Sequence, residues 1–256
     1  MARRLVGFMI DCERADIGPA AKFWSGALGL PIEDPDEGGD GRYALLGAGP
    51  GGIHVEVQRV EHPSRLHLDI EADDIHAEAD ALEALGATRI ANPHKRWWVM
   101  QAPTGHRFCV VRKRDREFPS RPRRSTLPKR HHSVLIALVI DCQVESLAPA
   151  LAFWSAALKR PIASHDQDGD GLYGELESGA EEVFVLLQKV AHESRVHLDI
   201  QTDDLDAEVA RLEKLGAKRE KFIKRWWVMQ APTGHRFCVV RQQPAKRITQ
   251  NTWGRR

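Results

Sequence analysis

The sequence predicts an α+β fold made of two copies of one domain. Two observations predict it: a long segment that recurs letter for letter, and strand and helix patterns that follow the same order in both halves. The segment KRWWVMQAPTGHRFCVVR occupies residues 95–112 and again residues 224–241. Shorter motifs upstream recur at nearly the same spacing, so a whole domain is duplicated and not one motif.

The pattern of repeat 1 predicts strand, helix, strands, twice over. Apolar and alternating runs predict strands over residues 5–10, 42–46, 53–60, 65–70, 96–101 and 106–112. Helical spacing predicts helices over 19–28 and 74–85. Gly29 and Gly86 follow these runs and are typical of helix ends.

We predict domain 1 over residues 1–112, a linker over 113–133, domain 2 over 134–241 and a polar tail over 242–256. The linker mixes basic residues with prolines and cannot bury apolar surface. We predict a solvated connector and not a segment that binds nucleic acid, because aromatic residues are not interleaved with the basic ones.

Bulk properties exclude several classes of protein. The net charge is +1, so neither nucleic acid nor an anionic membrane is expected as a partner. The four cysteines lack CxxC spacing and indicate free thiols in a reducing compartment. The first apolar run is too short for a signal peptide, and no run reaches the length of a membrane span. We therefore expect a soluble, cytoplasmic protein.

Three features together resemble the vicinal oxygen chelate superfamily, and within it the glyoxalase-like subgroup. They are the helix with Phe-Trp-Ser, the His-Leu-Asp-Ile strand before a helix led by Asp-Asp, and the Pro-Thr-Gly hairpin, and they occur in both repeats. The resemblance implies paired βαβββ modules whose curved mixed sheets form a concave cavity, often with a divalent metal. It also implies an intramolecular pseudo-dimer, itself a monomer or a homodimer.

The resemblance places a metal-binding histidine at His67 and at His197. Strand alternation puts His67 and Asp69 on one face, so the histidine can face a cavity. Neutral imidazole is a competent ligand for Zn, Ni or Fe. The alternative is a histidine hydrogen-bonded within the sheet and retained for packing.

The rest of the family's ligand set is incomplete. Its first-strand ligand falls among residues 7–9 and their counterparts, which do not suit a metal, and Cys109 and Cys238 replace its last-strand carboxylate. Its remaining acidic ligand matches Glu56, but the counterpart of Glu56 is Leu186. We therefore expect one divalent metal (Zn, Ni or Fe) or none.

Glu56 makes the two cavities unequal in this interpretation. If the modules pair within a repeat, Glu56 joins His67 and Cys109. If they pair across the pseudo-two-fold axis, it joins His197 and Cys238. We expect the cavity with Glu56 to be the active or tighter one, with Glu56 as general base or metal ligand. An exposed glutamate on a strand edge is the alternative.

Other residues are candidates for contact with a ligand. One indole of each Trp-Trp pair can stack on a planar molecule, and an inward arginine can bind a carboxylate or phosphate. The cysteines are ligands or small buried hydrophobes. The residues predicted to bind substrate are Trp98, Trp227, Arg107, Arg236, Asp69, Asp199, Cys109 and Cys238. We expect His106 and His235 on the surface of the hairpin turn.

Two classes of function remain open. The first is a lyase or isomerase that acts on a small oxygenated or planar molecule, with one degenerate metal site. The second is a non-catalytic, metal-independent protein that binds or sequesters such a molecule, as bleomycin-resistance proteins do. The superfamily contains both classes, and fold alone does not separate them.

Overall fold

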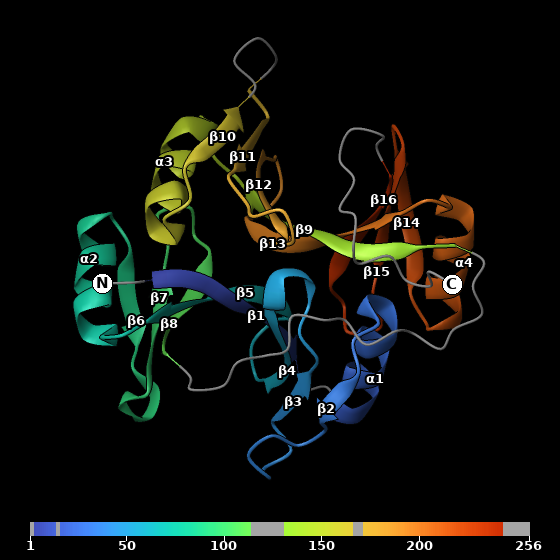
Figure 1. Cartoon of the computed structure of the whole chain (residues 1–256), viewed down its shortest axis with the longest axis horizontal. Helices are drawn as coiled ribbons and strands as arrows, with labels where there is room; N and C mark the ends of the chain where they lie inside the picture. The colour runs from blue at the N-terminus through green and yellow to red at the C-terminus, as the bar shows by residue number, and fades with distance from the viewer. Residues whose placement is uncertain (1–2, 14–15, 114–130, 166–170, 243–256) are drawn as a thin grey trace.

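The computed structural model describes residues 3–13, 16–113, 131–165 and 171–242. Within these ranges each repeat forms one eight-stranded mixed sheet and two α-helices (Figure 1). The predicted α+β tandem repeat is therefore confirmed. The predicted linker and tail fall almost wholly outside the described residues. No helix in the described ranges is long and apolar enough to cross a membrane.

The bounds of the elements repeat from one half to the other. Repeat 1 contains β1 (Arg3–Glu13), α1 (Ile17–Leu28), β2 (Ile32–Asp34), β3 (Tyr43–Leu46), β4 (His54–Val60), β5 (Arg65–Ala72), α2 (Ile75–Ala84), β6 (Thr88–Ala91), β7 (Trp97–Gln101) and β8 (Arg107–Arg112). Repeat 2 contains β9 (Ser133–Cys142), α3 (Leu147–Leu158), β10 (Ile162–His165), β11 (Tyr173–Leu176), β12 (Phe184–Lys189), β13 (Arg195–Thr202), α4 (Leu205–Lys214), β14 (Lys218–Ile223), β15 (Trp226–Gln230) and β16 (Arg236–Arg241).

The longer elements of repeat 1 lie where the sequence predicts them. The side chain of Asp16 accepts a hydrogen bond from the backbone of Gly18 at the start of α1, and Gly29 ends the helix with a φ of 60°. The edge strands β2 and β6 were not predicted, because three or four residues do not establish an alternating pattern.

The two βαβββ modules of one repeat lie side by side in a single sheet. The strand order is β2-β3-β4-β1-β5-β8-β7-β6, and repeat 2 has the same order. The central strands β1 and β5 are antiparallel, with Met9 opposite both His67 and Glu56. The modules therefore pair within a repeat, which settles the alternative left open by the sequence.

The helices and the apolar side chains share one face of each sheet, and the two repeats share one core. Phe23 and Trp24 of α1 pack against Phe237 of β16 in the other repeat, with ring centroids 6.4 and 5.9 Å away. Phe153 and Trp154 of α3 pack against Phe108 in the same way. Figure 1 shows α1 beside β15 and β16, and α3 beside β7 and β8. The opposite face of each sheet carries His67 or His197, and we call it the cavity face.

His106 and His235 are buried between the repeats, so the expectation that they lie on the turn surface was wrong. His106 Nε2 donates to the backbone oxygens of Asp141 and Arg195, at 3.0 and 3.1 Å. His235 Nε2 donates to the backbone oxygen of Arg65 at 3.1 Å. Burial lowers the pKa of both imidazoles, which therefore bind as neutral rings. A contact with a distant segment takes these side chains off the surface.

Helix α3 ends on a strained residue. Lys159 lies at the position of Gly29 and has a φ of 51°, where a side chain crowds the backbone. We expect Lys159→Gly to raise the free energy of unfolding by about 1 kcal/mol. Denaturant unfolding measures this, with Gly29→Ala as the matched control that should lower stability. Equal stability of Lys159→Gly and wild type would contradict the prediction.

Candidate metal centres and ligand cavity

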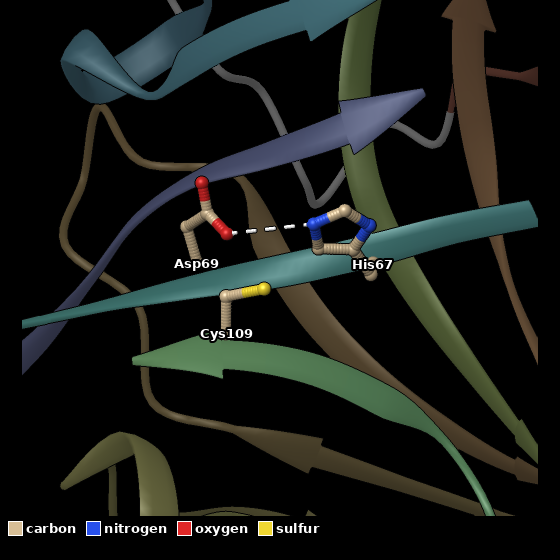
Figure 2. Close-up of side chains that lie close together, drawn as sticks. All are labelled: His67, Asp69 and Cys109. Carbon is tan, nitrogen blue, oxygen red and sulfur yellow. Dashed lines mark ion pairs between the residues drawn. The ribbon is translucent and has the colours of Figure 1, made fainter. Parts of the chain in front are cut away.

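Each repeat brings one histidine, one aspartate and one cysteine together on its cavity face. In repeat 1 these are His67 and Asp69 of β5 and Cys109 of β8, whose ligand atoms all lie within 4.8 Å of one another (Figure 2). Strand alternation puts His67 and Asp69 on one face, and the register places Cys109 beside Asp69. All three side chains are buried.

Repeat 2 builds the same group from His197, Asp199 and Cys238. His197 Nε2 lies 3.4 Å from Asp199 Oδ1, and the matching atoms of His67 and Asp69 are 3.7 Å apart. The structure thus places six sequence-predicted site residues in two equivalent groups. Asp69 and Asp199, which the sequence predicted as substrate contacts, are candidate metal ligands in the structure.

A second carboxylate orients each histidine from behind. Asp11 Oδ2 accepts a hydrogen bond from His67 Nδ1 at 2.9 Å, and Asp141 Oδ2 accepts one from His197 Nδ1 at the same distance. With Nδ1 occupied, Nε2 is the atom that faces Asp69 or Asp199. Metal-ligating histidines are commonly held in this way. The sequence analysis missed Asp11 and Asp141, although both recur in the Ile-Asp-Cys motif.

The charges at the site favour protonated side chains in the absence of a metal. Burial opposes the charged imidazoles, but Asp11 raises the pKa of His67, and Cys238 and Asp141 raise that of His197, to well above the usual value. Burial raises the pKa of both Cys109 and Cys238. Binding of a cation must therefore displace protons from both the histidine and the thiol.

The residues present fit a divalent metal. One nitrogen, one oxygen and one sulfur donor suit Zn²⁺, and three protein ligands leave a position for a substrate oxygen. Asp199 Oδ1 is buried, and its contact with His197 Nε2 at 3.4 Å falls short of a hydrogen bond. A carboxylate oxygen is therefore available as a metal ligand beside the histidine and the cysteine. His197, Asp199 and Cys238 would hold the ion in repeat 2, and their counterparts would hold it in repeat 1.

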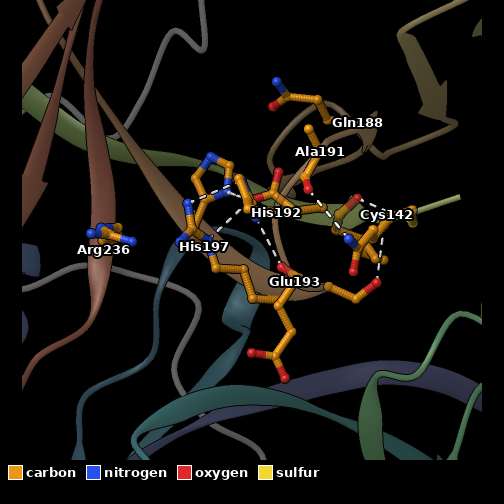
Figure 3. A network of polar contacts seen from close by, with 12 residues as sticks. Cys142, Gln188, Ala191, His192, Glu193, His197 and Arg236 are labelled. Atoms are coloured by element: carbon orange, nitrogen blue, oxygen red, sulfur yellow. Dashed lines mark hydrogen bonds and ion pairs between the residues drawn. The ribbon is translucent and has the colours of Figure 1, made fainter.

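The group of repeat 2 lies in a cavity of about 690 Å³, a size that suits a small organic molecule. Phe184 and Leu186 of β12 form one wall, and Trp226 of β15 forms part of another. His192, His197 and Arg236 also line this cavity, and Figure 3 shows His192 beside His197, with Arg236 on a separate strand. His192 and Arg195 both lie against Asp141, at 3.7 and 3.2 Å from its Oδ2.

Each repeat has a glutamate on this pair of strands, Glu56 in repeat 1 and Glu175 in repeat 2. The expectation that only one cavity keeps such a carboxylate was therefore wrong. Leu45 of β3 lies opposite Glu56 of β4, whereas Glu175 of β11 lies opposite Leu186 of β12. Leucine and glutamate have exchanged places across the same strand pair. Glu175 lines the cavity of repeat 2, while Glu56 makes an ion pair with His54 at 3.1 Å.

The structure also corrects the choice of tryptophan. Trp98 and Trp227 pack against the core on the helix side, and Trp98 donates a hydrogen bond to His76 of α2. Strand alternation puts their neighbours Trp97 and Trp226 on the cavity face, and Trp226 lines the cavity. The hairpin pattern could have predicted this, because Gln101 pairs with Arg107 and alternation then puts Trp97 on the same face as Cys109.

Both predicted arginines lie on the cavity face, and each donates a hydrogen bond to a side chain of another strand in its sheet. Arg107 donates to Gln101 Oε1 at 2.7 Å, and Arg236 donates to Glu220 Oε2 at 2.5 Å. Arg236 also lines the cavity of repeat 2, as predicted for a ligand contact.

Comparisons with solved structures show the same fold at low sequence identity. The Mn(II)-bound glyoxalase of Novosphingobium aromaticivorans matches with a TM-score of 0.60 and 16% identity, over 94% of this chain and 83% of that one. The 2,2′,3-trihydroxybiphenyl 1,2-dioxygenase of Sphingomonas wittichii matches with a TM-score of 0.59 and 15% identity, over 94% and 91%. A 2,3-dioxygenase from Pseudomonas sp. matches with a TM-score of 0.61 and 12% identity, over 93% and 92%.

Sequence comparison identifies the family but no individual relative. No curated protein sequence matches the chain significantly. The family model described as "Glyoxalase-like domain" matches residues 7–111 and 137–240, one stretch in each repeat. The chain therefore belongs to the glyoxalase-like domain family, within the vicinal oxygen chelate superfamily, as a tandem two-domain member.

Proposed function

We propose that this protein binds a small oxygenated molecule on a divalent metal, with one metal centre in each repeat. The observation that carries the proposal is the convergence of one ligand atom each from a histidine, an aspartate and a cysteine within 4.8 Å on both cavity faces. The orienting bonds from His67 to Asp11 and from His197 to Asp141 support it.

The chemistry that fits best is proton transfer next to a substrate oxygen, as in a lyase or isomerase. A metal supplies Lewis acidity that polarises such an oxygen. Glu175 lines the cavity of repeat 2 and is the proposed general base there. Glu56 keeps the same proposed role in repeat 1, where His54 holds its carboxylate. In repeat 2, Arg236 and Trp226 border the cavity and would orient the substrate.

One observation favours a second candidate, a metal-independent binding protein. Without a metal, each imidazolium lies between two carboxylates, Asp11 and Asp69 in repeat 1 and Asp141 and Asp199 in repeat 2. Arg65 lies 3.3 Å from Asp11 and Arg195 lies 3.2 Å from Asp141, so in each repeat two cations face two carboxylates. Such a group is electrostatically compensated and can bind a ligand by hydrogen bonds alone.

Metal content separates the two candidates. We expect protein purified without an affinity tag or chelator to hold about two metal ions per chain by elemental analysis, one for each group of ligands. His67→Ala and His197→Ala should each lose about one ion, and Glu56→Ala none. His76→Ala, an exposed histidine on α2, is the control and should keep both. A metal-free wild-type protein after zinc dialysis would overturn the proposal in favour of the second candidate.

A further inference from the structure

The cavity face of each repeat is built by two modules, and only one of the two modules is the same in both repeats. The module that carries the proposed metal ligands is matched residue for residue between repeats at the histidine, aspartate, cysteine, arginine and inward tryptophan. The other module differs at several positions on the cavity face. The pairs include Gly7 and Ala137, Met9 and Val139, Leu45 and Glu175, His54 and Phe184, and Glu56 and Leu186.

In repeat 2 these differences make an apolar floor beside the metal group. Val139 and Ala137 of β9 form a small apolar cluster with Ile136, and Phe184 and Leu186 pack against it on the cavity face. Phe184 and Leu186 are only partly buried, so their apolar surface is open to the cavity. Glu175 of the neighbouring strand β11 lies directly opposite Leu186 and lines the same cavity.

In repeat 1 the same floor is polar and filled. His54 Nε2 lies 3.1 Å from Glu56 Oε1, and the two side chains are only 6% and 3% exposed. Gly7 lies against His54, and a Cβ at position 7 would lie 3.0 Å from both the Cβ and the backbone oxygen of His54. Leu45, the counterpart of Glu175, is 1% exposed. An apolar ring therefore finds no open apolar surface at this floor.

We propose that the cavity of repeat 2 is specific for a ring-bearing molecule with oxygen substituents, and that repeat 1 does not bind this class. The ring lies on Phe184 and Leu186, and the oxygen atoms face His197 and its partners. Residues 137, 175, 184 and 186 are thus the specificity determinants of the chain. This inference rests on the proposed function for the binding of the oxygen atoms, but the preference for a ring rests on the apolar floor alone.

Two probes with the same spacing of oxygen groups test the preference. Salicylate carries a carboxylate and a hydroxyl on adjacent ring carbons, whereas 3-hydroxypropionate carries both groups on adjacent carbons without a ring. Isothermal titration of the zinc-loaded full chain should show one salicylate site per chain. We expect 3-hydroxypropionate to bind about 10- to 100-fold more weakly, because it buries no ring on Phe184 and Leu186.

Exchanging the floors between repeats provides matched variants, because each set of residues already occurs together in the other repeat. The variant that gives repeat 2 the floor of repeat 1 is Ala137→Gly/Glu175→Leu/Phe184→His/Leu186→Glu. The reciprocal variant is Leu45→Glu/His54→Phe/Glu56→Leu, which keeps Gly7 because a Cβ there would lie 3.0 Å from the backbone oxygen of residue 54. We expect the first to bind no salicylate and the second to bind about two equivalents. Both should keep the zinc content of wild type, which shows that the metal groups are intact.

The outcomes distinguish this inference from the proposed function. Two equal salicylate sites in wild type, no salicylate binding by zinc-loaded protein, or no change in the exchanged variants would overturn the inference. Salicylate bound once per chain without any zinc would overturn the proposed metal centres and leave the preference of repeat 2 in place.

Discussion

Replacing Trp24 with alanine should lower the free energy of unfolding by about 3–5 kcal/mol, the usual cost of removing a large buried aromatic side chain. Trp24 is fully buried, and it lies edge-on to both His235 and Phe237 of the other repeat. Its Nε1 donates a hydrogen bond to Thr233 Oγ1 at 3.1 Å. The lost free energy therefore comes largely from contacts between the two repeats. Guanidinium unfolding monitored by far-UV circular dichroism measures it.

The pseudo-symmetric residue gives the internal control. Trp154 is also fully buried and donates to Thr104 Oγ1 at 3.2 Å, so Trp154→Ala should cost as much as Trp24→Ala. Trp24→Phe keeps most of the packing and should cost clearly less than Trp24→Ala. A change below about 1 kcal/mol for Trp24→Ala, typical of a surface substitution, would mean that the repeats do not share a core.

Asp141→Asn should weaken metal binding at repeat 2 by about 10- to 100-fold while leaving repeat 1 unchanged. The carboxylate holds His197 through Nδ1, and an amide would neither fix this tautomer nor raise the basicity of the ring. Competition with a chelator of known affinity measures the two sites. Asp11→Asn should weaken the site of repeat 1 in the same way.

The pH dependence gives this prediction a second readout. The pKa of His197 and that of Cys238 are both raised, so protons compete with the metal and affinity should increase as pH rises. Removing the charge of Asp141 lowers the pKa of His197, so this increase should occur at lower pH in Asp141→Asn. Asp203→Asn, an exposed carboxylate outside the cavity, should change neither affinity nor its pH dependence. An Asp141→Asn protein with the same affinity and pH profile as wild type would contradict the orienting role.

Local pattern predicted most of the fold because the elements that matter are long and duplicated. Alternation identified β5, and Gly29 marked the end of α1. The same reasoning failed for His106 and His235, since their burial depends on backbone oxygens of the other repeat. A sequence pattern carries no signal for a contact across 89 or 170 residues of chain.

The candidate site was predicted in part for the same physical reason. Alternation puts His67 and Asp69 on one face, but their approach to Cys109 depends on strand register, which sequence does not fix. The exchange of Leu45 and Glu56 for Glu175 and Leu186 was visible in the aligned repeats. Comparison of Glu56 with Leu186 alone does not reveal it, because the second glutamate lies on the neighbouring strand.

The central claim is that each repeat holds one metal on a histidine, an aspartate and a cysteine. Anomalous diffraction from a crystal of the zinc-loaded full chain, measured at the zinc absorption edge, tests it most directly. We predict two anomalous peaks per chain, one among His67 Nε2, Asp69 and Cys109 and one among His197 Nε2, Asp199 and Cys238. A peak at His54 and Glu56 instead, or no peak on either cavity face, would contradict the claim.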